Sequence, residues 1–316
     1  MRAVMFDRYG DESVLGLRDI AVPDPGANEV QVRVHVASLN PVDFKLRAGL
    51  FRLFRKPKLP AITGKDFAGR ISAIGANVTG FPLGQRVFGS VNPMMGSGSC
   101  VQILVIGTDL LAATPDAVTD AIAACLPVAS GTAVQALKAI AQLRSGQSVL
   151  TTGASGAVGS SAVQIARSVG AHITGVCSTA NVGYVRSIGA DEVVDYKKAD
   201  WRRLGKTFDV IFDAAGASTF ALSRRCLSPT GFYINTFPHA SMFLTSKIVG
   251  LTSRQHSVPF MLKTDAASLR ELAQLAEQKI LQPHIAQTIR LEDVASAQRQ
   301  MQDGKIHGKI CVRITE

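Results

Sequence analysis

Three glycines at a regular spacing form the stretch of this sequence with the clearest chemical meaning. Gly153, Gly156 and Gly159 stand three positions apart, after a short apolar run at 149–152 and before a helical pattern at 160–167. In such a turn the first glycine permits a sharp bend, the second lets the backbone approach a ligand, and the third lets helix and strand pack closely. The pattern predicts a site for a pyrophosphate, bound by the unpaired N–H groups at the start of the helix.

The spacing is also compatible with an ordinary turn between a strand and a helix. It is Gly-x-x-Gly-x-x-Gly rather than the commoner Gly-x-Gly-x-x-Gly. The surrounding sequence favours the nucleotide site, because further strand patterns at 172–177, 209–213 and 232–235 alternate with helical patterns. Repeated alternation of this kind predicts an α/β fold, a doubly wound parallel sheet of Rossmann type that binds a dinucleotide.

Polar residues after the second strand pattern indicate which dinucleotide binds. An NADH site carries an acidic residue about 20 positions beyond the glycines, bonded to the ribose 2′-hydroxyl. Around that position the sequence has no Asp or Glu and offers Ser178, Thr179 and Asn181. These donors suit a 2′-phosphate, so we expect NADPH, with Arg186 or Lys197 as the source of positive charge. Alternatively, Ser178 and Thr179 only cap the following helix.

The bulk composition indicates a globular chain with an ample core. Of its 316 residues, 47% are hydrophobic and 18% are charged, and a chain of this length usually makes two domains. No run approaches the roughly 18 apolar residues of a membrane helix, and the first residues match a strand rather than a signal peptide, so we expect no membrane span. Five scattered cysteines without a C-x-x-C pair favour reduced thiols and a cytoplasmic location.

The net charge of +10 raises the question of a nucleic-acid partner. The lysines and arginines are dispersed, and the sequence has no helix-turn-helix, zinc-finger or RNP-like pattern. We therefore expect no nucleic acid, and interpret the charge as solvated surface that also attracts a polyphosphate cofactor. The densest basic cluster, at 52–58, lies among phenylalanines and is interpreted as a solvated loop, with a substrate-side loop or an amphipathic surface that touches a membrane or a partner as alternatives.

The segments on either side of the glycine turn predict a second domain. Residues 29–36 alternate polar and apolar, which places four valines on one face of a strand. Turn signals separate further short strand patterns, which predicts an antiparallel barrel. These patterns lie at 3–6, 70–74, 86–88 and 101–106. Helical patterns at 265–278 and 291–301 and a last strand at 309–314 follow the Rossmann part. We expect an insertion, with the division 1–120, 121–262 and 263–316, whose last segment returns to the first domain.

A set of motifs in a fixed order carries a resemblance that spans nearly the whole chain. The motifs lie at 40–47, 64–69, 78–81 with 84–89, 126–133, the glycine turn, 177–179, 189–196 and 304–310. In this combination the chain resembles the zinc-free quinone oxidoreductase branch of the medium-chain dehydrogenase/reductase superfamily. The resemblance implies a GroES-like antiparallel β-barrel domain, an inserted Rossmann domain and an active cleft between them. It also implies NADPH, a small-molecule quinone or enone substrate, and a homodimer or homotetramer, often joined through an edge strand near 247–251.

The resemblance extends to the residues that would contact the cofactor. Beyond the glycines of the turn, it implies contacts from the turn itself, from the ribose loop and from motifs before and after them. The expected cofactor-binding residues are Thr132, Gly153, Ser155, Gly156, Ala157, Val158, Ser178, Thr179, Asn181, Tyr196 and Lys309.

Zinc members of the superfamily place Cys, His and Glu or Cys around a catalytic metal, and this chain departs from that set. Asn40 stands in the place of the first cysteine, and the Gly-His-Glu motif is Gly64-Lys65-Asp66. Lysine is not an ordinary zinc ligand, the cysteine-rich loop of a structural zinc is absent, and the six histidines show no H-x-x-x-H. We therefore expect no metal.

Hydride transfer to a quinone or to an α,β-unsaturated carbonyl leaves negative charge on oxygen, which a nearby donor would stabilise. The motif at 40–47 supplies the catalytic candidates: Asn40 near the nicotinamide or the substrate, Lys45 as a cationic donor, and Asp43 to orient Lys45 or a backbone turn. Alternatively, Lys45 is a solvated lysine. Some relatives carry a tyrosine there, and its absence argues against a tyrosine donor.

The sequence therefore predicts an NADPH-dependent oxidoreductase that transfers hydride to a quinone or α,β-unsaturated carbonyl without a metal. The alternatives are an alkenal or enoyl-thioester reductase, and a non-catalytic relative that binds or senses NADPH. The fold names the reaction class and leaves the acceptor open.

Overall fold

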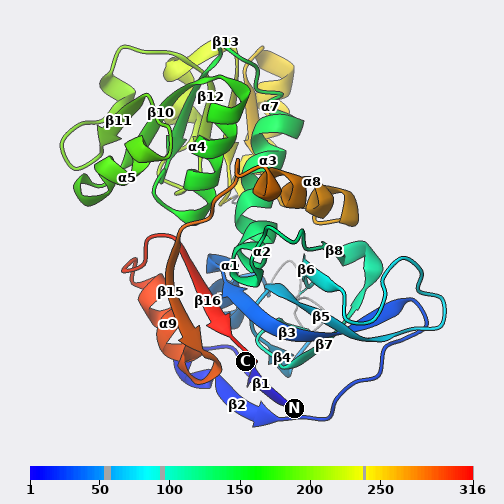
Figure 1. Ribbon diagram of the computed structural model, residues 1–316. Coiled ribbons are helices and arrows are strands. Elements are labelled where there is room, and N and C mark those ends of the chain that lie inside the picture. Colours follow the sequence, from blue (N-terminus) through cyan, green and yellow to red (C-terminus); the bar gives the residue numbers. More distant parts are fainter. Residues whose placement is uncertain (53–57, 93–96, 238–239, 316) are drawn as a thin grey trace. The chain divides into compact units, whose positions relative to one another are not determined.

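The computed structural model describes residues 1–52, 58–92, 97–237 and 240–315, and divides the chain into two compact units (Figure 1). The first unit consists of Met1–Val128, Thr264–Lys279 and Pro283–Glu316. The second unit consists of Ala129–Lys263 and Ile280–Gln282. Each unit has a sheet and a hydrophobic core of its own, and each is described separately.

The second unit contains a six-stranded sheet in which every neighbouring pair is parallel. The strand order is β11-β10-β9-β12-β13-β14, which is the 3-2-1-4-5-6 order of a doubly wound Rossmann sheet. The predicted α/β fold is therefore confirmed. The strands are β9 (Ser148–Thr152), β10 (His172–Cys177), β11 (Glu192–Asp195), β12 (Phe208–Asp213), β13 (Leu227–Asn235) and β14 (His256–Pro259).

Helix α4 follows the glycine turn and covers the centre of this sheet in Figure 1. It spans Ala157–Val169 and begins three residues before the predicted pattern. Ala162 and Ile165 on its inner face are fully buried, and Gly170 ends it in a left-handed conformation that glycine adopts without strain. The other helices of the unit are α3 (Gly131–Val134), α5 (Val182–Ser187), α6 (Phe220–Ser223) and α7 (Ala240–Thr252).

From the sequence we expect the edge strand of the Rossmann sheet near 247–251, and this prediction is wrong. Those residues belong to α7, and the edge strand is β14, which pairs with β13. The physical reason is that β13 and β14 are parallel. A parallel pair needs a crossover connection, and α7 is that connection.

The first unit contains two sheets in which all strand pairs but one are antiparallel. A three-stranded sheet has the order β2-β1-β4, and a larger sheet has the order β15-β16-β3-β5-β6-β8, with β7 paired to β3. The core of the unit lies between these strands and includes Val30, Val32 and Val34, whereas Val36 is only half-buried because the register shifts beside it. The strands are β1 (Arg2–Phe6), β2 (Gly16–Asp19), β3 (Glu29–Leu39), β4 (Ala61–Ile62), β5 (Asp66–Ile74), β6 (Arg86–Ser90), β7 (Ile103–Gly107) and β8 (Leu111–Ala113).

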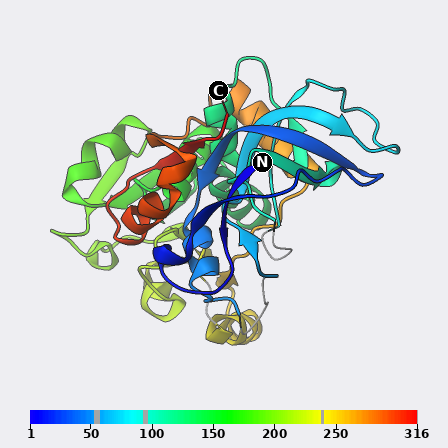
Figure 2. The same cartoon turned by 90° about the horizontal axis from the view of Figure 1, so that it is seen from below.

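The C-terminal segment returns to the first unit, as predicted. Strand β16 (Lys309–Arg313) pairs antiparallel with β3, and both views show the red last strand beside the blue β3 (Figures 1 and 2). Strand β15 (Ile285–Arg290) pairs parallel with β16, which departs from the expected antiparallel pattern. Helices α8 (Ala266–Glu277) and α9 (Val294–Gln302) precede and follow β15, and Asp265 caps α8 by accepting from Ser268 N–H at 2.8 Å.

The predicted division after residue 120 lies eight residues before the structural one. Helix α2 (Asp120–Cys125) packs on β3, β5 and β16, and so belongs to the first unit. Two side-chain contacts hold it there: Ser38 Oγ donates to the Ala124 carbonyl at 2.6 Å, and Arg86 Nη2 donates to Asp120 at 2.7 Å. The structural boundary lies inside a helical run that continues to Ile140, so no loop marks it in the sequence.

That helical run, Asp120–Ile140, is the one stretch of the described residues with the length and hydropathy to cross a membrane. Within its most apolar window, 72% of the residues are buried inside the protein. Core helices of folded domains commonly combine such hydropathy with such burial.

Candidate functional site

The glycine turn lies at the carboxyl end of β9, where neighbouring connections leave the sheet in opposite directions. Ligands of open α/β sheets bind at this switch point. Gly153 has φ +62°, a conformation that favours glycine. A Cβ on Gly159 would lie 2.1 Å from the Gly153 carbonyl oxygen, so this glycine lets α4 approach the turn.

Gly156 has a different role from its two neighbours. Its backbone is extended, and a Cβ there would meet only the Gly153 oxygen, at 3.3 Å. No side chain caps α4 at this position. The first N–H groups of the helix, at Ala157 and Val158, therefore start from an open and uncapped turn, which fits a pyrophosphate.

Two further predicted residues flank the turn. Ser155 is buried within it, and the preceding Ala154 N–H donates to the Val176 carbonyl at 3.0 Å, which ties the turn to β10. Thr132 lies on α3, which packs against α4, and the Ser130 and Ser161 hydroxyls meet there at 3.0 Å. A contact of Thr132 with a cofactor stays a prediction.

The expected ribose loop follows β10. Asn181 Nδ2 donates to Ser178 Oγ at 3.0 Å, and Thr179 Oγ1 donates to Asp195 Oδ2 at 2.6 Å. Ser178 does not cap the following turn through its side chain, so that alternative is not what the structure shows. Tyr196 lies beside the loop with its side chain exposed, and its N–H donates to the Cys177 carbonyl at 3.1 Å.

Asp195 is the residue that sequence reasoning missed. The search for an acidic partner covered only the loop after β10, whereas Asp195 ends β11 and is the register partner of Cys177. The hydrogen bond from Thr179 lowers the pKa of Asp195. The position of Asp195 at the end of a strand pattern could have identified it, because the last residues of adjacent parallel strands reach the same edge of a sheet. Lys197 and Lys198 follow directly, and Lys198 Nζ lies 4.0 Å from the carboxylate.

The first unit contains a buried polar cluster that joins three strands. Asn40 follows β3, Asp66 begins β5 and Lys309 begins β16. Lys309 Nζ donates to Asn40 Oδ1 at 2.7 Å and lies 3.6 Å from Asp66 Oδ2, and Asn40 Nδ2 donates to the same Asp66 oxygen at 3.0 Å. All three side chains are at most 2% exposed.

This cluster fixes the orientation of the Asn40 carboxamide, with its oxygen toward the ammonium and its nitrogen toward the carboxylate. Asp66 Oδ2 also accepts from Val128 N–H at 3.2 Å. Lys309, predicted as a cofactor contact, is thus brought together with the catalytic candidate Asn40. A cofactor contact of its own stays a prediction.

Asp43 holds the backbone at the start of α1 (Pro41–Arg47). Its Oδ2 accepts from Asn40 N–H at 2.7 Å, which is the second of the two roles expected for it. Oδ1 is buried without a hydrogen-bond partner among the described residues. Burial raises the pKa of Asp43 to about 7, assisted by the Asp66 charge and opposed by the Asn40 hydrogen bond and the charges of Lys309 and Lys65. The carboxyl therefore exchanges its proton near neutrality.

Lys45 is half-buried on the same helix, and burial lowers its pKa. It stands two positions after Asp43, which is about 200° around the helix axis. The two side chains therefore leave α1 in different directions, and Asp43 orients the backbone turn rather than Lys45. The role of Lys45 as a donor stays a prediction.

The described residues contain no group of three or more His, Cys, Asp or Glu side chains placed to hold a metal ion. Asn40, Lys65 and Asp66 occupy the positions that the resemblance assigns to zinc ligands, and Lys309 already places an ammonium between Asn40 and Asp66. Most of the basic cluster at 52–58 lies outside the described residues.

Known protein families match segments of this chain in both units. Residues 26–111 match the alcohol dehydrogenase GroES-like domain, and residues 188–312 match the zinc-binding dehydrogenase family. A chloroplast envelope quinone oxidoreductase homolog of Arabidopsis thaliana is 34% identical over 99% of this chain and 98% of its own. A 2-methylene-furan-3-one reductase of Solanum lycopersicum is 35% identical over 68% of this chain and 57% of its own.

Solved structures of quinone oxidoreductases are similar to this chain over its full length. The quinone oxidoreductase of Coxiella burnetii superposes with a TM-score of 0.90 at 25% identity, and the match covers 100% of this chain and 99% of the other. The order of the two domains, the strand order of the second unit and the matches over the full length lead to one conclusion. The chain belongs to the quinone oxidoreductase branch of the medium-chain dehydrogenase/reductase superfamily.

Proposed function

We propose that this oxidoreductase uses NADPH to reduce a quinone or an α,β-unsaturated carbonyl and needs no metal. The observation that carries the proposal is the open glycine turn at the start of α4, uncapped and placed at the carboxyl edge of the parallel sheet. The names of its relatives support the acceptor class. One is called a quinone oxidoreductase homolog, and another is called a reductase of a methylene-furanone, which is an enone.

Bound NADPH would supply the hydride, and the chain would bind and orient the reactants. Gly156, Ala157 and Val158 would hold the pyrophosphate at the helix start. In the first unit, the Lys309 ammonium and Asp66 fix the carboxamide of Asn40, so this amide is preorganised rather than free to rotate. Lys45 is our candidate for the donor that stabilises the developing oxyanion, and solvent would protonate an enolate.

The ribose loop supports NADPH over NADH. Ser178, Thr179, Asn181 and Tyr196 surround the position where the loop leaves β10. The Asp195 carboxylate accepts a hydrogen bond from the Thr179 hydroxyl, and Lys197 and Lys198 place two positive charges near this carboxylate. A 2′-phosphate would gain from these charges.

The buried cluster supports the proposal of metal-free catalysis. A catalytic zinc needs three protein ligands and an open position, and two of the corresponding positions already share the Lys309 ammonium. We expect that prolonged dialysis against a chelator leaves the turnover number unchanged, and that metal analysis finds less than one zinc per ten chains. Stoichiometric zinc, with activity that chelation removes and zinc restores, would contradict this part of the proposal.

Two further features concern the whole protein. All five cysteines are buried free thiols, which fits the cytoplasmic location that we propose. The edge strand β14 and the exposed apolar side chains of the neighbouring helix α7 offer a surface for a second copy of the chain, so we propose a homodimer, or a homotetramer built from such pairs.

The test is a titration with NADPH and with NADH, followed by turnover with a panel of acceptors. The panel contains 1,4-benzoquinone, 9,10-phenanthrenequinone, an alkyl vinyl ketone, an alkenal and an enoyl thioester. Tighter binding of NADPH, together with its oxidation by a quinone or the ketone, would support the proposal. Turnover of the alkenal or thioester alone would assign the alternative reductase, and tight binding without any turnover would assign a non-catalytic NADPH-binding protein.

A further inference from the structure

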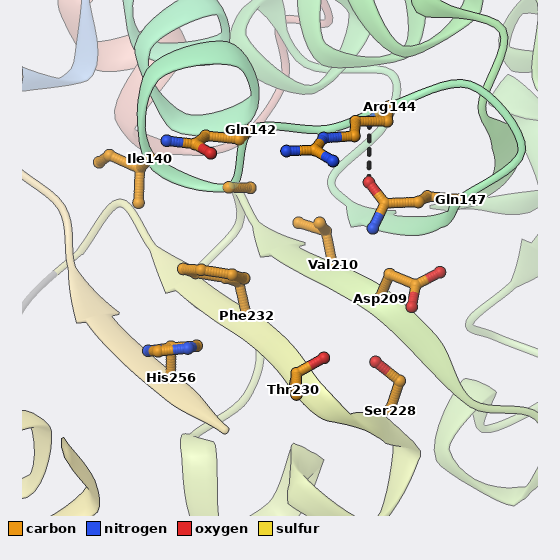
Figure 3. Close-up of a pocket in the computed structure, with 11 residues that line it drawn as sticks. Ile140, Gln142, Arg144, Gln147, Asp209, Val210, Ser228, Thr230, Phe232 and His256 are labelled. Atoms are coloured by element: carbon orange, nitrogen blue, oxygen red, sulfur yellow. Dashed lines mark hydrogen bonds between the residues drawn. The ribbon is translucent and has the colours of Figure 1, made fainter. Parts of the chain in front are cut away.

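A cavity of about 360 Å³ opens in the second unit at the edge of the sheet opposite the glycine turn. It lies at the amino ends of the strands, beside Asp209 near the start of β12 and His256 at the start of β14 (Figure 3). The glycine turn follows the carboxyl end of β9. The cavity is therefore separate from the predicted cofactor site, and its size is in the range of small-ligand pockets, about 300–1,000 Å³.

One wall of the cavity is flat and aromatic. Phe232 on β13 and His256 on β14 are register partners, and their rings stack with centroids 4.2 Å apart and planes 16° from parallel. In Figure 3 the Phe232 ring lies below Gln142 and Arg144, with Val210 beside it. A planar ring of a ligand would find an aromatic face here, at the offset or edge contacts that such rings prefer.

The opposite side carries an arginine without a partner. The loop before β9 is held by the Arg144 N–H, which donates to Gln147 Oε1 at 2.8 Å, and by the Leu143 N–H, which donates to the Leu137 carbonyl at 2.9 Å. The Arg144 guanidinium pairs with none of the described residues, and Figure 3 shows it extended over the cavity. A guanidinium in this setting favours a planar anion such as a carboxylate.

A bulge in β13 adds a hydroxyl to the cavity. Between the pairs Phe208↔Leu227 and Val210↔Phe232, β13 has four residues against one in β12. The bulge presents Ser228, whose Oγ is buried without a hydrogen bond of normal geometry. This hydroxyl interacts with the neighbouring Asp209 carboxylate and helps to lower its pKa.

Asp209 limits where an anion can lie. Burial alone would raise the pKa of Asp209, but hydrogen bonds from Ser148 N–H and Oγ, at 2.9 and 3.0 Å, and the Ser228 hydroxyl lower it. The carboxylate is therefore charged, and it points away from the Phe232 ring in Figure 3. An anionic group on a ligand would be repelled from this end of the cavity and drawn to Arg144.

We propose that this cavity binds a flat aromatic carboxylate. The ring lies against Phe232, and the carboxylate pairs with the Arg144 guanidinium. The proposal concerns a second site on the protein and does not depend on the identity of the reduced acceptor.

The experiment uses 2-naphthoate as the probe, in calorimetric titrations of the full chain with and without saturating NADPH. We expect one site whose affinity NADPH leaves unchanged. Arg144→Gln should weaken binding at least about tenfold, and Phe232→Leu should weaken it severalfold, since each removes one of the two main contacts. The neutral 2-naphthamide should bind about tenfold more weakly to the wild-type protein.

Arg225→Gln is the matched control, because Arg225 is an exposed arginine of the same unit outside the cavity, and it should bind 2-naphthoate like the wild type. Circular dichroism confirms that each variant is folded. Equal binding by Arg144→Gln and wild type would overturn the proposal. So would displacement of the probe by NADPH, or no binding at millimolar probe.

Discussion

At the scale of single residues, the buried Lys309 ammonium is the centre of the first unit's polar cluster. It serves Asn40 and Asp66 at once, at 2.7 and 3.6 Å, in surroundings that are nearly closed to solvent. Removing one partner of a buried ion pair leaves the other charge without compensation, whereas removing both relieves that cost. Removal of Asp66 should therefore stabilise a variant that already lacks Lys309, although it destabilises the wild type.

We predict that Lys309→Met lowers the free energy of unfolding by about 3–5 kcal/mol. Adding Asp66→Asn to this variant should restore part of that loss, because the buried carboxylate is then gone. Urea unfolding of the wild type, both single variants and the double variant measures the coupling. Lys58→Met, at an exposed lysine of the same unit, is the control. Additive effects of the two substitutions would mean that the pair does not interact.

Asp43 gives the first unit a pH dependence of known sign. Its folded pKa of about 7 lies above the unfolded value of 3.8, so the folded protein holds this proton more tightly than the unfolded chain. Stability from this group is therefore greatest at low pH, is lost as the pH rises from about 4 to 7, and does not change further above that range.

We predict that Asp43→Asn removes this loss. Asparagine keeps an oxygen that accepts from Asn40 N–H but does not titrate. Between pH 5 and 8, the decrease in unfolding free energy should be smaller in the variant by roughly 3 kcal/mol, at about 1.4 kcal/mol per pH unit below the folded pKa. Urea titrations across this range measure it, with the exposed Asp24→Asn as control. Parallel profiles for wild type and Asp43→Asn would refute the assignment.

At the scale of elements, the glycine turn separates two functions that a sequence pattern cannot tell apart. At Gly159 a Cβ would collide with the Gly153 carbonyl oxygen at 2.1 Å, whereas at Gly156 it would touch that oxygen at 3.3 Å and otherwise enter open space. One glycine is required for packing of α4 on β9, and the other keeps the helix start accessible.

We predict that Gly159→Ala lowers the melting temperature, because backbone must shift to accept the methyl group. Gly156→Ala should keep the melting temperature and weaken NADPH binding by about tenfold or more, since the methyl group stands where a pyrophosphate would approach. Thermal unfolding and fluorescence titration separate the two effects. Gly183→Ala is the control, because Gly183 lies on a helix with open space around it. This substitution should leave the NADPH affinity unchanged and should not lower the melting temperature. Unchanged NADPH affinity in Gly156→Ala would place the cofactor elsewhere.

Elements whose order and period are local could be predicted from the sequence. The β9 turn, α4, β10 and the capped helix α8 follow from apolar runs, glycines and a capping residue. The edge strand was misplaced because the resemblance alone put it at 247–251, and the residues of α7, apolar on nearly all sides, have no period that would have corrected it. Only the parallel pairing of β13 and β14 requires a crossover there.

The candidate site could likewise be predicted only where its residues lie close together in the sequence. Residues within one motif, such as Asn40 with Asp43 or the glycines of the turn, were found together. Contacts that join distant segments were not. Asp195 reaches Thr179 through the register of β11 against β10, and Lys309 reaches Asn40 through the pairing of β16 with β3, 269 positions apart in sequence. Pairing of this kind is set by tertiary structure rather than by local pattern.

At the scale of the whole molecule, the surface of α7 is the feature that asks for a partner. Its exposed apolar side chains are Phe243, Leu244, Ile248 and Leu251, which are between 45% and 88% exposed. Neighbouring β14 ends the sheet, and its outer edge pairs with no strand among the described residues. A self-complementary surface on a two-fold axis would bury the apolar side chains of both copies and continue the sheet across the axis.

We predict that the chain is a dimer in solution and that Leu244→Lys separates it into monomers. A charge on the buried patch of each copy would lie next to its symmetry mate and cost more than the apolar contact that it replaces. Sedimentation velocity over a range of concentrations measures the mass. Leu83→Lys is the matched control, because Leu83 is 63% exposed against 62% for Leu244 and belongs to the first unit. A wild-type chain that sediments as a monomer would contradict the predicted dimer. A Leu244→Lys variant that is as dimeric as Leu83→Lys would show that the contact does not involve this part of α7. A monomeric Leu244→Lys variant that still binds NADPH would show that each copy carries a complete cofactor site.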